Sequence, residues 1–312
     1  MKRDDAMTIS PPIRDEEASA RADASAGRVV TRFAPSPTGR LHLGHAFSAL
    51  RAHDLARAHG GLFLLRIEDI DPGRAREEHV AGIMEDLRWL GLDWDGEVVR
   101  QSARLPLYAD ALGRLKAMDL IYPCFCTRAE IAASATAPHG PEDAPLYPGT
   151  CRALYPAERE SRRATTPHAW RLDMARAAAL AGPLVWRDEI QGLVAAIPRA
   201  AGDVVLARKD APVSYHLAVT VDDAAQQVSD VVRGRDLFAA THIHRLLQAL
   251  LGLPTPAYHH HALLHGPDGR RLAKRDGAPT IAALREAGED AARLVAALRE
   301  GKLSIGFAAA AV

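Results

Sequence analysis

The apolar segment at residues 62–67, LFLLRI, constrains the fold of this chain more than any other feature. A short, nearly continuous apolar strand is typical of a parallel sheet that is covered on both faces. Parallel strands need a crossover connection, which is usually a helix. The preceding residues provide one: a strand at 29–34 is followed by Pro and Gly breakers and a helix over 46–59, and Gly60 and Gly61 end that helix. The pattern predicts an α/β fold.

The remaining apolar patterns extend this prediction. Val80, Ile83, Met84, Leu87 and Leu90 have the spacing of one helix face that packs on the sheet. No internal repeat is visible. Further along the chain we expect a hairpin formed by 203–208 and 214–221. A strand at 228–233, a helix at 240–251 and a strand at 258–264 should follow, and the last strand should end in a turn at 266–269. Near the end of the chain we expect an Arg-rich helix around 284–302.

Charge and composition exclude several classes of protein. Lys plus Arg and Asp plus Glu both total 39, so no global positive field marks a nucleic-acid-binding protein, and any RNA contact must be local. No apolar run approaches the roughly 20 residues that cross a bilayer, and the N-terminus lacks the apolar core of a signal peptide. We expect a cytoplasmic protein with no membrane contact. The three cysteines are an odd number, which favours reduced thiols or a metal over disulfides.

The segment RFAPSPTGRLHLGH at residues 32–45 carries the first chemical signal. A strand end, a Gly and Pro turn, and two histidines at a helix start place imidazole N–H groups and unpaired backbone amides at the positive end of a helix dipole. A triphosphate can bind there. The plain alternative is a histidine-capped helix in an unrelated α/β protein.

The motif His42-Leu43-Gly44-His45 resembles the HIGH signature of class I aminoacyl-tRNA synthetases, and RFAPSPTG resembles its glutamate-specific members. The resemblance implies a Rossmann-like parallel sheet, in which a zinc-binding, acceptor-type subdomain is inserted. The segment RLAKR at 271–275 resembles the second signature, KMSKR, imperfectly, because Arg271 replaces a lysine and Ala273 a serine. A solvated basic loop is the alternative.

By this resemblance His42, His45 and Lys274 stabilise the transition state, and ATP, with Mg²⁺ on its phosphates, contacts His42, Gly44, His45, Arg271 and Lys274. No general base is needed, because attack of a carboxylate on a phosphorus depends on alignment and charge neutralisation.

A glutamate site needs two cations for two carboxylates and one anion for the ammonium group. Arginine suits carboxylates because its planar fork forms two parallel charge-assisted bonds. The resemblance assigns Arg32 to the side-chain carboxylate, Arg233 to the α-carboxylate and Glu68 to the amino group. A surface ion-pair network at strand ends is the alternative. The full predicted set is Arg32, Phe33, Ala34, Pro35, Ser36, Glu68, Tyr215 and Arg233.

Two motifs favour glutamate over glutamine. The related glutamine enzymes resemble RFPPEPNG and RFDDT where this chain has RFAPSPTG and RIEDI. Only His45 is closer to the glutamine pattern.

The cysteines predict a structural zinc site. Three thiolates and one further donor complete a closed tetrahedral shell, which stabilises an insertion that has little core of its own. Cys124, Cys126 and Cys151 supply the thiolates. Bacterial relatives show a similar CxC followed by Tyr-x-x-x-Cys, which makes Tyr147 the fourth ligand, with His139 as its substitute. Three unrelated reduced cysteines are the alternative.

These signals divide the chain into five parts. We expect a disordered tail at 1–27, the halves of the catalytic domain at 28–118 and 201–285, the inserted subdomain at 119–200, and a C-terminal helix and tail at 286–312. Only residues 276–312 follow the basic loop, which leaves no room for the anticodon-binding domain of glutamyl-tRNA synthetases.

The resemblance, over 28 to about 290, therefore points to the stand-alone paralogues of those enzymes. They activate L-glutamate with ATP without needing tRNA and attach it to queuosine in tRNA(Asp). We expect a monomer. The rival functions are a truncated glutamyl-tRNA synthetase that charges the tRNA 3′ end, a carrier-protein glutamyl ligase and a non-catalytic RNA-binding paralogue.

Overall fold

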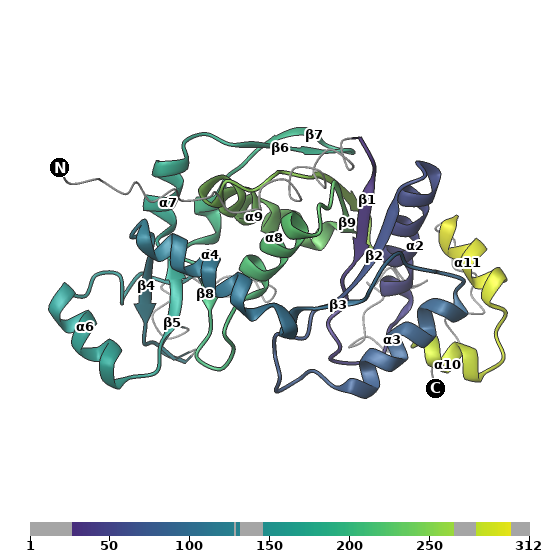
Figure 1. Ribbon diagram of the computed structural model, residues 1–312, viewed down its shortest axis with the longest axis horizontal. Coiled ribbons are helices and arrows are strands. Elements are labelled where there is room, and N and C mark those ends of the chain that lie inside the picture. The colour runs from purple at the N-terminus through teal and green to yellow at the C-terminus, as the bar shows by residue number, and fades with distance from the viewer. Residues whose placement is uncertain (1–26, 128, 132–145, 265–278, 301–312) are drawn as a thin grey trace, which may run out of the picture.

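The computed structural model describes residues 27–127, 129–131, 146–264 and 279–300 (Figure 1). Its first half contains the expected parallel sheet. Strand β1 (Val30–Phe33) leads through α2 (Leu43–Ala58) to β2 (Leu62–Ile67), which pairs parallel to it. Helix α3 (Glu77–Trp89) then leads to β3 (Val99–Arg100), which pairs parallel to β2. The predicted buried strand is confirmed, since Phe63, Leu65 and Ile67 are fully buried.

A second parallel sheet completes the α/β part of the fold. Strand β9 (Asp230–Gly234) pairs parallel to β10 (Ala257–His261), and η3 (Arg235–Leu237) and α9 (Phe238–Leu251) connect the two. Strand β6 (Val185–Asp188) adds to β10 in parallel, and β7 (Gly192–Ala195) forms an antiparallel edge. The predicted strands at 228–233 and 258–264 and the helix at 240–251 are confirmed, with small shifts at their ends.

The two sheets meet along β1 and β9. The backbone N–H of Ser229 donates to Val30 O at 3.0 Å, and Val30 N–H donates to Ser229 Oγ at 2.8 Å. Chain connections run outward in opposite directions from this seam, to β2 and β3 on one side and to β10 and β6 on the other. Open α/β sheets bind ligands at the carboxyl ends of strands at such a switch point.

A third, antiparallel sheet lies to the left of the parallel strands in Figure 1. It consists of β4 (Ile121–Cys124), β5 (Ala169–Leu172) and β8 (Val205–Ala207), with β5 in the middle. The helical elements of this part of the chain are η1 (Gln101–Arg104), α4 (Leu105–Ala117), α6 (Pro156–Thr165), α7 (Met174–Ala181), η2 (Pro198–Ala201) and α8 (Tyr215–Ala225).

The predicted hairpin at 203–208 and 214–221 is wrong. Its first strand is β8, but the second segment forms helix α8. Leu217, Ala218 and Val221 follow one helical face and pack in a core that also contains side chains of α4 and α9. The apolar run alone does not distinguish a buried strand from a buried helix, and here the tertiary contacts decide.

The single helix expected at 284–302 is also wrong. Two short helices, α10 (Ile281–Glu286) and α11 (Ala291–Arg299), are separated by Gly288 at φ +77°. They lie beside α2 and α3 in Figure 1 and share their core. Arg285 donates to Asp86 on α3 at 2.9 Å, and Arg299 donates to Asp54 on α2 at 2.8 Å. These arginines link α10 to α3 and α11 to α2.

No helix within the described ranges has both the length and the apolar character required to span a membrane.

Candidate active site

The pocket at the carboxyl ends of β1 and β9 has a volume of about 490 Å³. Every described residue of the predicted glutamate and ATP sites lines it. These residues come from the end of β1 and the turn after it, the start of α2, the end of β2, the start of α8 and the carboxyl end of β9: Arg32, Phe33, Ala34, Pro35, Ser36, His42, Gly44, His45, Glu68, Tyr215 and Arg233.

The two histidines cap the start of α2. The His42 side chain accepts from Gly44 N–H at 3.1 Å, and the His45 side chain accepts from His42 N–H at 3.3 Å. Their ring centroids are 3.8 Å apart. This reciprocal cap explains why α2 begins three residues before the predicted start at 46. It fixes both imidazoles at the positive end of the 16-residue helix, which borders the pocket.

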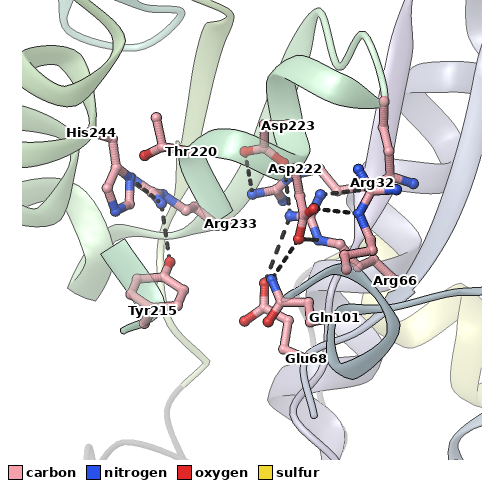
Figure 2. Close-up of polar contacts among 12 residues, drawn as sticks. Arg32, Arg66, Glu68, Gln101, Tyr215, Thr220, Asp222, Asp223, Arg233 and His244 are labelled. Carbon is pink, nitrogen blue, oxygen red and sulfur yellow. Dashed lines mark hydrogen bonds and ion pairs between the residues drawn. The ribbon is translucent and has the colours of Figure 1, made fainter. Parts of the chain in front are cut away.

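Arg32 does not extend freely into the pocket. It is 5% exposed, and its guanidinium donates to both carboxylate oxygens of Asp223 on α8, at 2.9 Å and 3.3 Å (Figure 2). Arg66 of β2 shares this carboxylate at 2.7 Å. Burial raises the pKa of Asp223, but the two guanidiniums outweigh it and the pKa is lowered overall. Asp223 is therefore an anion shared by two cations.

Glu68 lies at the end of β2, where its backbone N–H donates to Pro35 O at 3.0 Å and so holds the turn after β1 against β2. Its carboxylate is 3.7 Å from Arg66. Burial raises the pKa of Glu68 to about 7. The nearby guanidiniums of Arg66 and Arg32 lower this pKa, and the carboxylate of Asp223 raises it, but burial has the largest effect. Glu68 can therefore change its protonation near neutral pH.

Beneath this layer Asp222 is fully buried. It accepts hydrogen bonds from Gln101 at 2.8 Å, from Arg104 at 2.7 Å and from the Tyr108 hydroxyl at 2.7 Å. These three residues belong to η1 and α4. The Asp222 carboxylate therefore links the β3 side of the sheet to α8, which carries Asp223 and Tyr215. A buried carboxylate persists only with such partners.

Arg233 is held by neutral acceptors instead of a carboxylate. Its guanidinium donates to Thr241 Oγ1 at 2.6 Å, His260 Nε2 at 3.1 Å, Leu237 O at 3.2 Å, and His244 Nδ1 and the Tyr215 hydroxyl at 3.3 Å each. Figure 2 shows Arg233 with Tyr215 and His244 as one cluster, separate from the cluster of Arg32, Arg66 and Asp223. The predicted pair of arginines is thus brought to one pocket, in two different electrostatic settings.

The cysteines of the inserted part also come together. The sulfur atoms of Cys124, Cys126 and Cys151 lie within 4.8 Å of one another, and those of Cys126 and Cys151 are 3.5 Å apart. The Tyr147 hydroxyl oxygen lies 3.8 Å from Cys126 Sγ. Tetrahedral zinc with Zn–S bonds of about 2.3 Å places its sulfur ligands about 3.8 Å apart, so the cluster fits a zinc ion. The substitute ligand His139 lies outside the described residues.

A second pocket of about 470 Å³ continues from the first. The two share Ser36, Thr38, Glu68 and Tyr215. The second pocket reaches Tyr147 and Arg171 of the inserted part, so it runs from the candidate glutamate site towards the cysteine cluster.

Arg271 and Lys274 lie outside the described residues. Described residues near both ends of their segment lie at the first pocket or contact a residue that lines it. Leu264 lines it, and Thr280 forms an antiparallel bridge with His42.

Sequence reasoning missed the residues that hold the two arginines. Asp223, which accepts from Arg32, was not part of the predicted site, and neither were His244, His260 and Thr241, which accept from Arg233. An acidic pair in the apolar stretch before residue 224 was the one available signal, because buried carboxylates need cationic partners.

The fold and this pocket define an ATP-using ligase of the α/β synthetase type. Residues 28–307 match the catalytic domain of the class I tRNA synthetases for glutamate and glutamine (E and Q), and the chain belongs to this family.

Individual proteins that are similar to this chain have more specific names. The chain is 52% identical to a glutamyl-Q tRNA(Asp) synthetase of Rhodobacter capsulatus, over 83% of this chain and 96% of that protein. It is 49% identical to the protein of that name from Symbiobacterium thermophilum, over 82% of this chain and 81% of the relative. The solved structure of a glutamate tRNA ligase from Elizabethkingia meningosepticum in complex with its amino acid superposes with a TM-score of 0.68 at 31% identity. That match covers 80% of this chain and 52% of the ligase, so this chain spans about half of the solved protein.

Proposed function

We propose that this protein activates L-glutamate with ATP, without tRNA, and transfers the glutamate to queuosine in tRNA(Asp). One observation carries the proposal: a capped helix start, two buried arginines and a buried carboxyl line a single pocket at the switch point of the sheet. The pocket offers cations for two carboxylates and an anion for an ammonium group. The names and high identities of the relatives support the same acceptor.

In the first step the α-carboxylate of glutamate attacks the α-phosphorus of ATP, and pyrophosphate leaves. Arg32 binds the side-chain carboxylate, Arg233 the α-carboxylate and Glu68 the ammonium group. The start of α2 holds the rings of His42 and His45 at the positive end of the helix, beside the phosphates, which favours the charge that develops in the transition state. Mg²⁺ accompanies the ATP phosphates.

Lys274 and Arg271 complete the phosphate site in this proposal. Among the described residues that flank their segment, Leu264 lines the pocket and Thr280 bridges to His42 at the proposed phosphate position. This supports the assignment of Arg271 and Lys274 to the ATP phosphates.

In the second step a hydroxyl of the acceptor attacks the acyl carbon of the glutamyl-adenylate, an ester bond to glutamate forms, and AMP leaves. The second pocket shares Glu68 and Tyr215 with the first, so an acceptor nucleoside bound there would lie next to the activated carboxyl group. Its volume of about 470 Å³ suits one nucleoside, since small-molecule sites commonly measure about 300–1,000 Å³.

The cysteine cluster binds one structural zinc ion, with Cys124, Cys126, Cys151 and Tyr147 as ligands. The three sulfur atoms and the phenol oxygen lie at separations that suit a tetrahedral shell. Such a site would hold the segment after β4 to the segment before α6.

Two measurements test the proposed function. ATP–pyrophosphate exchange should depend on glutamate and proceed without tRNA. Labelled glutamate should then be transferred to tRNA(Asp) that contains queuosine and not to the same tRNA without it. Transfer to unmodified tRNA(Asp), or charging of tRNA(Glu) at its 3′ end, would refute the acceptor assignment. A lack of glutamate-dependent exchange would refute the activation step.

A further inference from the structure

Arg233 is a buried cation that lacks an anionic partner in the described part of the chain. It is 5% exposed, and the five acceptors around its guanidinium are two imidazole nitrogens, two hydroxyls and one backbone carbonyl. Arg32, at the same pocket, is paired with Asp223 through two hydrogen bonds. An uncompensated buried cation is costly for folding, so its surroundings require a functional explanation.

The imidazoles around Arg233 can act only as neutral acceptors. Guanidinium has no acceptor, so His260 Nε2 and His244 Nδ1 must each present a lone pair. His260 then carries its proton on Nδ1, which donates to Asp188 at 2.7 Å. His244 carries its proton on Nε2, which lies 3.2 Å from His216 Nδ1. Each ring is thereby fixed in one tautomer.

The electrostatics agree with this geometry. Burial, assisted by the charge of Arg233, lowers the pKa of His260 to about 4 and that of His216 to about 4, and it lowers the pKa of His244 well below its usual value. The three rings stay neutral at neutral pH. Asp188 reaches Arg233 only through His260, so its charge does not neutralise the guanidinium directly.

We propose that His244, His260 and Thr241 form a neutral cage that positions Arg233 and keeps its positive charge available for a carboxylate of the amino acid. The cage accepts from three of the five guanidinium N–H groups, and Leu237 O and the Tyr215 hydroxyl accept from the other two. It thereby fixes the plane of the fork, yet it adds no negative charge to compete with the substrate. The inference rests on the proposed glutamate activation. It adds positioning residues that determine the preference of the site for an anionic substrate.

A matched pair of substitutions separates the charge of the cage from its shape. In His244→Asn the side-chain oxygen can replace Nδ1 as a neutral acceptor, whereas His244→Asp has the same shape and adds one negative charge. The dissociation constant of glutamate, measured by calorimetry, and KM and kcat in ATP–pyrophosphate exchange are compared for the two variants.

His244→Asn should keep the KM of the wild-type protein within a few-fold. His244→Asp should raise KM and the dissociation constant relative to His244→Asn by about tenfold or more, with kcat largely kept, because one added charge next to Arg233 competes strongly at an effective dielectric constant of about 20. A purely structural role would instead lower the active fraction and kcat in both variants and leave KM unchanged. Equal KM values for the two variants would refute the proposed role of the neutral cage.

Two controls keep the test decisive. If His244→Asp does not fold, as judged by circular dichroism, His260→Glu against His260→Gln repeats the comparison, because the side-chain oxygen of Gln can replace Nε2. A wild-type protein without glutamate-dependent exchange would refute the proposed function. A wild-type protein that does exchange, together with equal KM values in the Asp and Asn variants, would refute the cage alone.

Discussion

The protonation of Glu68 leads to a quantitative expectation for glutamate binding. In the proposed site this carboxyl receives the substrate ammonium group and must be ionised to do so. Burial raises its pKa to about 7 in the free protein, so a change from pH 8 to pH 6 removes most of the charged form. With that pKa about ten molecules in eleven are ionised at pH 8 and about one in eleven at pH 6. The apparent affinity for glutamate should therefore fall about tenfold.

Calorimetric titration with glutamate, without ATP, measures this directly. Near pH 7 the binding should also release a proton from Glu68, which appears as a dependence of the measured heat on the ionisation enthalpy of the buffer. Glu68→Gln is the matched control, because it keeps the shape of the side chain and removes the titration. It should bind glutamate weakly, and equally so at pH 6 and pH 8. An affinity of the wild-type protein that does not change between these pH values would refute the reasoning.

The same pKa has a consequence for stability. A carboxyl whose pKa is higher in the folded state than the usual 4.5 contributes stability below pH 4.5, and this stability is lost as the pH rises through 7. The raised pKa corresponds to about 3 kcal/mol. Glu68→Gln should thus increase the free energy of unfolding at pH 8 by up to about 3 kcal/mol and change it little at pH 4. Urea denaturation at the two pH values tests this, and a variant less stable than the wild type at pH 8 would contradict it.

Three further outcomes are expected. Cys151→Ser should reduce bound zinc, measured by atomic absorption, from one ion per chain to a small fraction, and full zinc content would exclude this ligand. Tyr108→Phe removes a hydrogen bond to the buried Asp222 and should cost about 1–3 kcal/mol of unfolding free energy in urea, whereas an unchanged midpoint would show that water replaces the hydroxyl. Leu284→Ala opens a cavity between α10 and the sheet domain and should cost about 2–5 kcal/mol, with the exposed Leu193→Ala as a control that changes little.

The sequence predicted the framework of the site well because its signals are local. The buried strand at 62–67 and the helix before it follow from short apolar and turn patterns. The resemblance then selected residues as distant as Arg32 and Arg233, which line one pocket. Their individual roles in binding stay predictions.

The failures arise where distant contacts decide. An apolar run at 214–221 suits a strand or a helix, and only its packing with α4 and α9 selects the helix. The pattern of the Arg-rich segment at 284–302 predicts one helix, but the chain turns at Gly288. This turn lets α10 and α11 both pack in the core that contains α2 and α3. The acceptors of Arg233 could not be predicted either, since His244 and His260 belong to α9 and β10 and meet the guanidinium only in the folded chain.

The charges around the pocket suggest why a dicarboxylic amino acid suits it. Arg32 and Arg66 share one carboxylate, that of Asp223, so this group keeps one net positive charge. Arg233 contributes a second, since its partners are neutral. When Glu68 ionises to receive the ammonium group, one positive charge is left over, and glutamate with its two carboxylates and one ammonium group cancels it. Glutamine is neutral overall and would leave that charge buried and unbalanced, which is unfavourable in a site removed from water. In the proposed arrangement the selectivity for glutamate therefore depends on what each arginine is already paired with, as well as on the presence of the two arginines.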